Sequence, residues 1–457
     1  MDISKIVENQ KHFFKTDKTK EVTYRKKLLK KLLSEVENRE KDITDALFAD
    51  FKKCEYEAVL TETGYIISEL KLMIKKINSW SKPTWVFPAL LNFPSSSKIY
   101  NNPLGIVLII APWNYPYQLA LAPLIGAIAA GNTVVLKPSE LTPNTSKIIK
   151  EICEAVFDVT HVAVVEGGVA VSTELLAQRW DYIFFTGSVQ VGKIVAKAAA
   201  KNLTPMTLEL GGKNPCIIDE TADLKLTAKR IVWGKCINAG QTCIAPDYFL
   251  IHKSVKEKFV TYFKAEVENA YGKNPQESDD FPRIVNEKNF ERLKKMLANE
   301  KILVGGKTDA SENYISPTLI DEPSLDSEVM KGEIFGPISP VISYENESDL
   351  EKIIGNYEKP LAFYVFTTNM KFAKKMIHKY SFGGGTINDT TVHFANNNLP
   401  FGGVGESGIG SYHGKRTFDV FTHKKGITKR YNWLDLPVRY APYNGKLKSL
   451  KKFMKLF

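Results

Sequence analysis

Five short apolar runs between residues 105 and 210 constrain the fold of this chain more than any other feature of its sequence. The runs are apolar at nearly every position, which is typical of strands buried on both faces. A helix-like segment separates each run from the next, as in parallel strands joined by crossover helices. The pattern predicts an α/β fold whose parallel sheet is covered by helices on both sides. The runs lie at residues 105–110, 133–136, 161–165, 182–185 and 206–210.

A second alternating series, from about residue 223 to residue 387, predicts a second α/β unit. Its strands are expected near Phe249, Leu319, Val341 and Tyr364.

The ends of the chain follow other patterns. The first part is expected to be helical up to about residue 80, because apolar residues recur there at spacings of three and four. Residues 82–102 are rich in proline and serine, which predicts a loop or an edge ribbon, and residues 418–430 are expected to pair with it.

The charge of the chain is concentrated in its tail. Hydrophobic residues make up 44% of the 457 residues and charged residues 25%, which is ordinary for a globular protein. The formal net charge is +11, but five lysines within residues 446–455 leave only +6 for the rest. Basicity is therefore weak evidence for nucleic acid, and no nucleic-acid partner is expected.

The tail itself predicts a short amphipathic helix. Its apolar residues fall on one helical face, with the lysines mostly opposite, and such a helix can lie on an anionic membrane. Docking against the same subunit or a partner subunit is the favoured interpretation. The apolar residues are Leu447, Leu450, Phe453, Met454 and Phe457.

The cysteines and histidines indicate neither disulfides nor a metal site. The five cysteines include no CxxC pair and the seven histidines no HExxH motif. The N-terminus lacks the pattern of a signal peptide, and the apolar segment 104–130 is broken by prolines. We therefore expect no metal, a reducing compartment and a cytoplasmic location.

Cys243 and Glu209 form a candidate pair of nucleophile and base. Cys243 follows a predicted helix and lies among small and polar residues, where backbone amides can stabilise a thiolate. A single cysteine is more often a small buried residue. Glu209, however, lies in the strand-like run LELGG, whose apolar residues raise a carboxyl pKa as a base for water requires. The two residues together predict covalent catalysis.

A glycine turn between a predicted strand and helix is a candidate phosphate site, since backbone amides at a helix N-terminus bind phosphate. A purely structural need for glycine stays open. Lys137 and Glu140 follow an earlier strand, where they could hold ribose hydroxyls or form only a solvated pair. The turn consists of Gly187, Ser188, Val189, Gln190, Val191 and Gly192.

Two further turns carry candidate site residues. Asn114, between two prolines, offers an amide donor for an oxyanion, although asparagine is also common in ordinary turns. Glu333 and Phe335 place a carboxylate and an aromatic ring on one turn, and core packing also accounts for the ring.

Seven motifs, in this order and spacing, resemble those of the aldehyde dehydrogenase superfamily: APWNYP, LKPSE, FFTGSVQVG, LELGGKNP, the GQTC cysteine, EIFGP and PFGGVGESGIG. The resemblance covers nearly the whole chain. The PWNYP form and the sequence SYHGK near the end resemble the class 3 and fatty aldehyde branch.

The resemblance implies a Rossmann-like NAD(P)-binding domain at residues 1–84 and 104–211 and a catalytic domain at residues 212–417. It also implies a β oligomerisation ribbon at residues 85–103 and 418–434, before a basic tail at residues 435–457. A homodimer is expected.

The resemblance also assigns roles to matching residues. Cys243 would be the nucleophile and Glu209 the base for the deacylating water, while Asn114 and the Cys243 amide would form the oxyanion hole. The cofactor pyrophosphate would lie along residues 187–192. Lys137 and Glu140 would bind the adenosine ribose, Glu333 the nicotinamide ribose, and Phe335 would lie beside the nicotinamide.

The implied reaction is oxidation of aliphatic (medium- or long-chain) or aromatic aldehydes to carboxylic acids, through a thiohemiacetal and a thioester on Cys243. Glu140 favours NAD, although class 3 relatives with a similar motif also use NADP. Tyr65, Tyr115, Trp233 and Phe394 are expected to line an apolar substrate tunnel, and packing alone also accounts for them.

Three rival interpretations fit less of the sequence. A cysteine hydrolase or acyltransferase would use Cys243 and Glu209 but would give the glycine turn at residues 187–192 no function. A nucleotide hydrolase of the P-loop type is disfavoured because Ile194 stands where that motif needs a hydroxyl. A non-enzymatic basic binding protein would account for the tail and none of the inner motifs.

Overall fold

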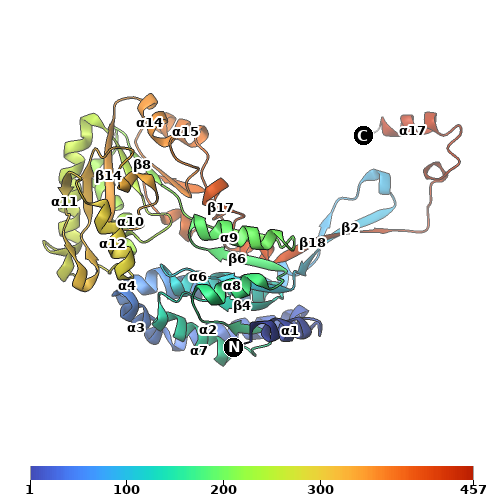
Figure 1. Cartoon of the computed structure of the whole chain (residues 1–457). Helices are drawn as coiled ribbons and strands as arrows, with labels where there is room; N and C mark the ends of the chain where they lie inside the picture. The colour runs from blue at the N-terminus through green and yellow to red at the C-terminus, as the bar shows by residue number, and fades with distance from the viewer. Residues whose placement is uncertain (1, 456–457) are drawn as a thin grey trace.

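The computed structural model describes residues 2–455, which form two open sheets, a small ribbon and their covering helices (Figure 1). The first sheet has six strands in the order β17-β7-β6-β3-β4-β5, all parallel except β17. Each of the five apolar runs forms one of its strands, so the predicted α/β class is confirmed. The strands are β3 (Ile106–Ile110), β4 (Thr133–Lys137), β5 (Val162–Val164), β6 (Tyr182–Thr186), β7 (Met206–Glu209) and β17 (Gly408–Ile409).

The order of these strands places a topological switch point at β3. From β3 the chain passes to β4 and β5 on one side, and then returns to β6 and β7 on the other side. Ligands of open parallel sheets bind at such a switch point, beyond the carboxyl ends of the strands.

Helices cover both faces of this sheet. Helix α6 (Pro116–Ala130) is buried along its whole length. The apolar segment 104–130 therefore forms the buried strand β3 and this core helix. Leu29, Leu32 and Val36 of α2 are buried at the expected helical spacing. The remaining helices here are α1 (Ile3–Phe14), α2 (Val22–Asn38), α3 (Glu40–Phe51), α4 (Glu55–Ala58), α5 (Gly64–Trp80), α7 (Pro143–Val156), α8 (Val169–Ala177) and α9 (Val189–Ala200).

The second sheet has seven strands in the order β10-β13-β14-β9-β8-β15-β16, with only β10 antiparallel. The strands predicted near Phe249, Leu319, Val341 and Tyr364 are confirmed as β9, β13, β14 and β15. The bounds are β8 (Pro215–Ile218), β9 (Tyr248–His252), β10 (Ile302–Val304), β13 (Thr318–Asp321), β14 (Ile338–Tyr344), β15 (Ala362–Phe366) and β16 (Gly384–Ile387).

Helices also cover the second sheet, and a two-stranded hairpin lies beside it. The helices are α10 (Leu224–Cys236), α11 (Lys256–Tyr271), α12 (Glu287–Met296), α13 (Glu328–Lys331), α14 (Glu347–Ile354) and α15 (Met370–Lys379), and the hairpin is β11 (Thr308–Asp309) with β12 (Tyr314–Ile315).

A three-stranded antiparallel ribbon extends away from the two sheets (Figure 1). It contains β1 (Thr84–Val86), β2 (Ser95–Pro103) and β18 (Thr422–Arg430), and β18 follows α16 (Lys415–Val420). The predicted pairing of the early edge segment with residues 418–430 is therefore present, since β18 pairs with β2 along its whole length.

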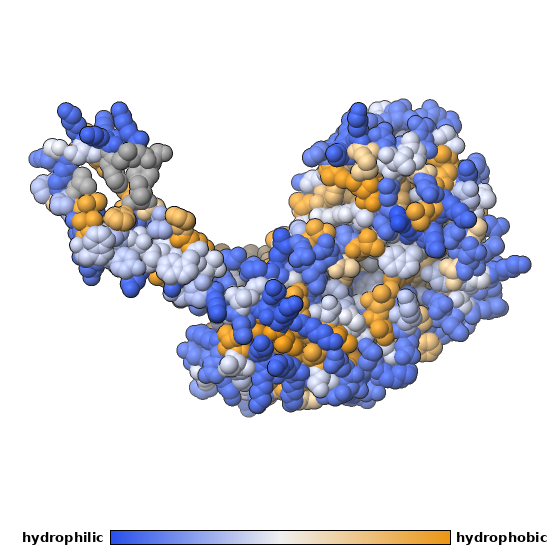
Figure 2. Space-filling view, turned by 180° about the vertical axis from the view of Figure 1, so that it is seen from behind, coloured by the Kyte–Doolittle hydropathy of each residue, from blue (hydrophilic) through white to orange (hydrophobic). Residues whose placement is uncertain are grey.

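The chain after Arg430 forms an arm that carries α17 (Leu447–Met454) at its end (Figure 1). Trp433 packs edge-on against Phe93 of the ribbon, with ring centroids 6.0 Å apart. Apolar side chains lie open on this arm (Figure 2), including Leu447, Leu450 and Met454 of the predicted helical face. Among the described side chains of that face, these three are exposed rather than packed against the same subunit, while Phe457 lies outside the described residues. In the described part of the chain, the helices are all too short or too polar to cross a membrane.

Candidate active site

Cys243 is held on a turn of unusual backbone conformation. Three consecutive residues before it have positive φ: Asn238 at 54°, Ala239 at 52° and Gly240 at 73°. A Cβ atom on Gly240 would lie 2.3 Å from the carbonyl oxygen of Gly336, so only glycine fits there. A left-handed stretch of this kind persists only where the surroundings fix it.

Side-chain amides fix the turn from behind. Asn214 donates from Nδ2 to the carbonyl oxygens of Cys243 (2.8 Å) and Ala245 (3.0 Å), and its Oδ1 accepts the Ala362 amide at 2.8 Å. Gln241 donates to the Asn238 carbonyl oxygen and accepts the amide of Val285, both at 3.0 Å.

Asn114 reaches the same turn from the loop after β3. Its Nδ2 donates to the carbonyl oxygen of Gln241 at 3.1 Å, and its own carbonyl oxygen accepts from Asn238 Nδ2 at 2.7 Å. Tyr115 adds a hydroxyl contact to Thr242 at 2.7 Å. The structure therefore brings the predicted oxyanion donor into contact with the turn that carries the predicted nucleophile.

Glu209 is the last residue of β7 and is buried. Within residues 2–455, neither of its carboxyl oxygens has a hydrogen-bond partner. Burial therefore raises the pKa of Glu209 well above its usual value. A carboxyl group in this state can take a proton from water once it is ionised.

The thiol of Cys243 also has a raised pKa. Burial is the main cause, and the charges of Glu333 and Glu209 act in the same direction, while the amides of Cys243 and Ile244 oppose them. Burial of the thiol therefore disfavours the thiolate and opposes the effect of the backbone amides, so a base is needed to take its proton before the sulfur can act as a nucleophile.

Cys243 and Glu209 line one pocket of about 190 Å³ with mostly apolar walls. All four residues predicted to line the substrate tunnel lie in this wall: Tyr65, Tyr115, Trp233 and Phe394.

Tyr412 also lines the pocket, and no role was predicted for it. Its buried hydroxyl has no partner among the residues described. The SYHGK motif near the end of the chain was the available signal.

Lys137 ends β4 and lies at the carboxyl edge of the first sheet. Its buried ammonium donates to the carbonyl oxygen of Pro138 at 3.0 Å and to Glu140 Oε2 at 2.5 Å. Glu140 is partly exposed. The two predicted ribose ligands therefore form an ion pair at this edge of the sheet.

The glycine turn lies at the end of the adjacent β6. Ser188 caps α9 by accepting the Val191 amide at 3.4 Å, and the side chains of Ser188, Gln190 and Val191 are exposed. The N-terminus of α9 is thus open to an anion. Gly192 has a packing role as well, since a Cβ there would lie 2.6 Å from Leu210 Cδ2.

Glu333 and Phe335 lie on the loop between α13 and β14. The Glu333 carboxyl group lies over Gly211, where a Cβ atom would come within 2.3 Å of Oε2. Burial raises the pKa of Glu333 to about 8, helped by the charge of Asp247. Phe335 packs edge-on against Trp113, with centroids 5.2 Å apart.

A buried ion pair that the sequence did not reveal holds this loop. Asp247 accepts the amide of Ile334 at 2.9 Å and pairs with Lys213 at 2.7 Å. Lys213 also donates to the carbonyl oxygens of Val329 and Gly332, both at 2.9 Å. Lys213 belongs to the LELGGKNP motif, but its partner is 34 residues away along the chain.

These residues fit a dinucleotide lying across the edge of the first sheet. The open helix end suits a pyrophosphate, and the Lys137–Glu140 pair suits a ribose. Glu333 Oε1 is buried and, in the part of the chain that is described, has no partner, which leaves an acceptor for a second ribose hydroxyl.

Comparison with known proteins agrees with this site. The model of the Aldehyde dehydrogenase family matches residues 1–427. The 4,4'-diaponeurosporen-aldehyde dehydrogenase of Staphylococcus aureus is 47% identical over 98% of both chains. The dimeric NADP-preferring aldehyde dehydrogenase of Canis lupus familiaris is 41% identical over 97% of this chain and 99% of its own. The substrate-bound structure of Staphylococcus aureus AldH superimposes with a TM-score of 0.98 at 46% identity, covering 99% of this chain and 100% of that one. The chain therefore belongs to the aldehyde dehydrogenase family and is an oxidoreductase that oxidises aldehydes with NAD or NADP.

Proposed function

We propose that Cys243, Glu209 and Asn114 carry out the oxidation. The supporting observation is that Cys243 and Glu209 line one apolar pocket while Asn114 is bonded to the turn that holds Cys243. Glu209 in its ionised form takes the proton of the Cys243 thiol and passes it to solvent, while the sulfur adds to the aldehyde carbon and forms the oxyanion of a thiohemiacetal. The Asn114 side-chain amide and the Cys243 backbone amide donate to the oxyanion.

A nicotinamide bound beside Phe335 would supply the hydride acceptor, and loss of hydride from the thiohemiacetal would leave a thioester on Cys243. Glu209 then takes a proton from water, and the resulting hydroxide attacks the thioester carbon. The carboxylic acid leaves and the sulfur is restored.

For the cofactor, we propose that residues 187–192 hold the pyrophosphate and that Lys137 and Glu140 hold the adenosine ribose. Glu333 would accept from the nicotinamide ribose, with Phe335 beside the ring. A carboxylate at the adenosine ribose repels a 2′-phosphate, which favours NAD. The similarity to an NADP-preferring relative keeps NADP as an alternative.

We propose medium- or long-chain aliphatic, or aromatic, aldehydes as substrates. The apolar wall formed by Tyr65, Tyr115, Trp233 and Phe394 supports this class, because a charged aldehyde would lose its hydration there without a partner.

We further propose a cofactor-binding part at residues 1–84 and 104–211, a catalytic part at 212–417, and a homodimer formed through residues 85–103 and 418–434. Large side chains exposed on ribbon and arm support the dimer, as does the dimeric relative. For the tail, docking against the partner subunit remains favoured over membrane contact. A cytoplasmic location is proposed because all five cysteines are free thiols.

Formation of reduced nicotinamide tests the central proposal. Absorbance is followed with NAD and with NADP, using hexanal and benzaldehyde, for the wild type and Cys243→Ala. Turnover is expected in the wild type and not in the variant, which should still bind the cofactor. Equal turnover by Cys243→Ala would contradict the assignment. Cys243-dependent ester cleavage without any cofactor reduction would support the hydrolase instead.

A further inference from the structure

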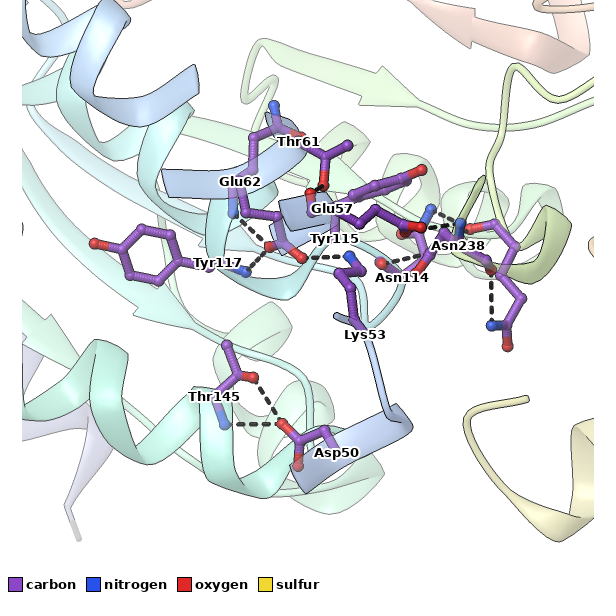
Figure 3. A network of polar contacts seen from close by, with 12 residues as sticks. Asp50, Lys53, Glu57, Thr61, Glu62, Asn114, Tyr115, Tyr117, Thr145 and Asn238 are labelled. Atoms are coloured by element: carbon purple, nitrogen blue, oxygen red, sulfur yellow. Dashed lines mark hydrogen bonds and ion pairs between the residues drawn. The ribbon is translucent and has the colours of Figure 1, made fainter. Parts of the chain in front are cut away.

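A buried polar cluster lies behind the proposed oxyanion hole and has no assigned role (Figure 3). It belongs to the segment that runs from the end of α3 through α4 and the π-helical turn Val59–Thr63. Lys53, Glu57 and Glu62 of this segment are all buried. Since buried charges are costly without partners, their partners show what the segment holds in place.

Glu62 and Lys53 hold the loop that follows Asn114. Glu62 Oε1 pairs with Lys53 Nζ at 2.5 Å. Its other oxygen accepts the backbone amide of Tyr117 at 2.9 Å, in the first turn of α6. The Lys53 ammonium also lies 4.3 Å from the ring centroid of Tyr115, directly next to Asn114.

Glu57 holds the turn on the other side (Figure 3). Its Oε1 accepts the backbone amide of Asn238 at 2.8 Å. Asn238 is the first of the three left-handed residues before Cys243, and its side chain donates to the carbonyl oxygens of Asn114 and Gln241. The bond to Glu57 therefore fixes Asn238, which in turn bonds to Asn114 and to Gln241 in the turn that carries Cys243.

We propose that Glu57 is a positioning residue for aldehyde oxidation, which acts by holding the Asn238 turn so that Asn114 and Cys243 keep their relative geometry. The proposal rests on the proposed roles of Cys243 and Asn114. Glu57 acts through a backbone amide, so an oxygen acceptor at this position is what matters. Through Glu62, the same segment also holds the first turn of α6, three residues after Asn114.

The test compares three variants of the full-length protein. Glu57→Ala removes the acceptor, Glu57→Gln keeps an oxygen acceptor without the charge, and Glu55→Gln changes an exposed carboxylate on the same short helix. For each, kcat and the KM of the cofactor are measured, together with the rate at which iodoacetamide alkylates Cys243. Melting temperature and cofactor binding report the folded state.

Glu57→Ala is expected to lower kcat about 10- to 100-fold, because small displacements of reacting groups have effects of that size. The KM of the cofactor should stay the same, since the cofactor residues lie elsewhere. Glu57→Gln should restore most of the turnover, and Glu55→Gln should match the wild type. If Glu57→Ala does not fold, Glu57→Asp, whose carboxylate is one methylene short, replaces it with the same expectation.

Wild-type kcat and alkylation in folded Glu57→Ala, or in Glu57→Asp where that variant takes its place, would overturn the proposal, as would an equal loss in Glu57→Gln. Cys243→Ala, assayed in parallel, separates this failure from that of the proposed site. If Cys243→Ala is inactive and Glu57→Ala is normal, only the positioning role is wrong. If Cys243→Ala is active, the site assignment itself is wrong.

Discussion

The two sides of the Cys243 turn differ in how their polar groups are satisfied. On the pocket side, the carboxyl group of Glu209 and the hydroxyl of Tyr412 are buried without partners among the described residues. On the rear side, Asn214 and Gln241 use both their amide nitrogen and their amide oxygen in hydrogen bonds. A buried group left unpaired costs free energy, so it persists where a substrate or water meets it. The pocket side is therefore arranged for chemistry and the rear side for rigidity, and changes on the two sides should differ in their effects.

The largest effect is expected from Glu209→Gln, on the pocket side. An amide cannot take a proton from water, so hydrolysis of the thioester should slow about 1000-fold, within the range for general bases. Stopped-flow measurement should show one rapid equivalent of reduced cofactor per site, followed by a slow steady state. The control is Glu174→Gln, an exposed carboxylate on α8. A normal steady-state rate in Glu209→Gln would remove Glu209 from the role of base.

Asn114→Ala should lower kcat about 100-fold, as expected for loss of one oxyanion donor. Cofactor binding should stay at the wild-type level, because the predicted cofactor residues are untouched. The measurement is kcat with hexanal beside a fluorescence titration of the cofactor. A variant with unchanged kcat would show that the backbone amide of Cys243 suffices for the oxyanion.

Asn214→Ala is the matching change on the rear side. It leaves the carbonyl oxygens of Cys243 and Ala245 and the amide of Ala362 without their partner, so we expect a loss of about 3 kcal/mol of unfolding free energy. The fall in kcat should be smaller, about 10-fold, since no reacting group is removed. Urea unfolding and turnover are measured for both variants. Asn214→Ala should lose more unfolding free energy than Asn114→Ala, and Asn114→Ala should lose more kcat than Asn214→Ala. If one variant lost more of both quantities, the two sides of the turn would not differ in function.

The sequence predicted the pocket side better than the rear side. Cys243 and Glu209 lie in local motifs with a chemical meaning, so each could be found without coordinates. Asn214 was only one letter in the LELGGKNP motif, because its partners lie 29 and 148 residues away along the chain. Glu57 left no signal at all, since a helical glutamate normally faces water.

The fold shows the same limit. The first sheet was predicted completely among its parallel strands, because continuous apolar runs of this length are typical of strands buried on both faces. Strand β8 was not predicted, because it lies between the last run of the first series, at residues 206–210, and the start of the second series near residue 223. β10 and β16 lie at the edges of the second sheet; β10 has only three residues and β16 begins with two glycines, so neither forms a clear apolar run. The position of the arm depends on contacts such as Phe93 with Trp433, which no sequence spacing predicts.

The smallest effect on turnover is expected from Glu57→Gln. This variant tests whether Glu57 behaves like Glu209 on the pocket side or like Asn214 on the rear side. Burial raises the pKa of Glu57 to about 7 from an ordinary 4.5, although the charge of Lys53 opposes the shift. The folded state therefore holds this proton more tightly than the unfolded state, so the contribution of Glu57 to wild-type stability is greatest below pH 4.5 and is lost as the pH rises through 7. A shift of this size corresponds to at most about 3 kcal/mol.

Glutamine cannot ionise, so this variant should lose that part of the pH dependence. Its melting temperature should exceed that of the wild type at pH 8, with the difference shrinking towards pH 5. If Glu57→Gln is more stable than the wild type at pH 8 and its kcat falls slightly, Glu57 resembles Glu209: its burial lowers stability but supports turnover. If the melting temperature and kcat of Glu57→Gln both fall at pH 8, the charge of Glu57 stabilises the fold, and Glu57 belongs with Asn214 on the rear side.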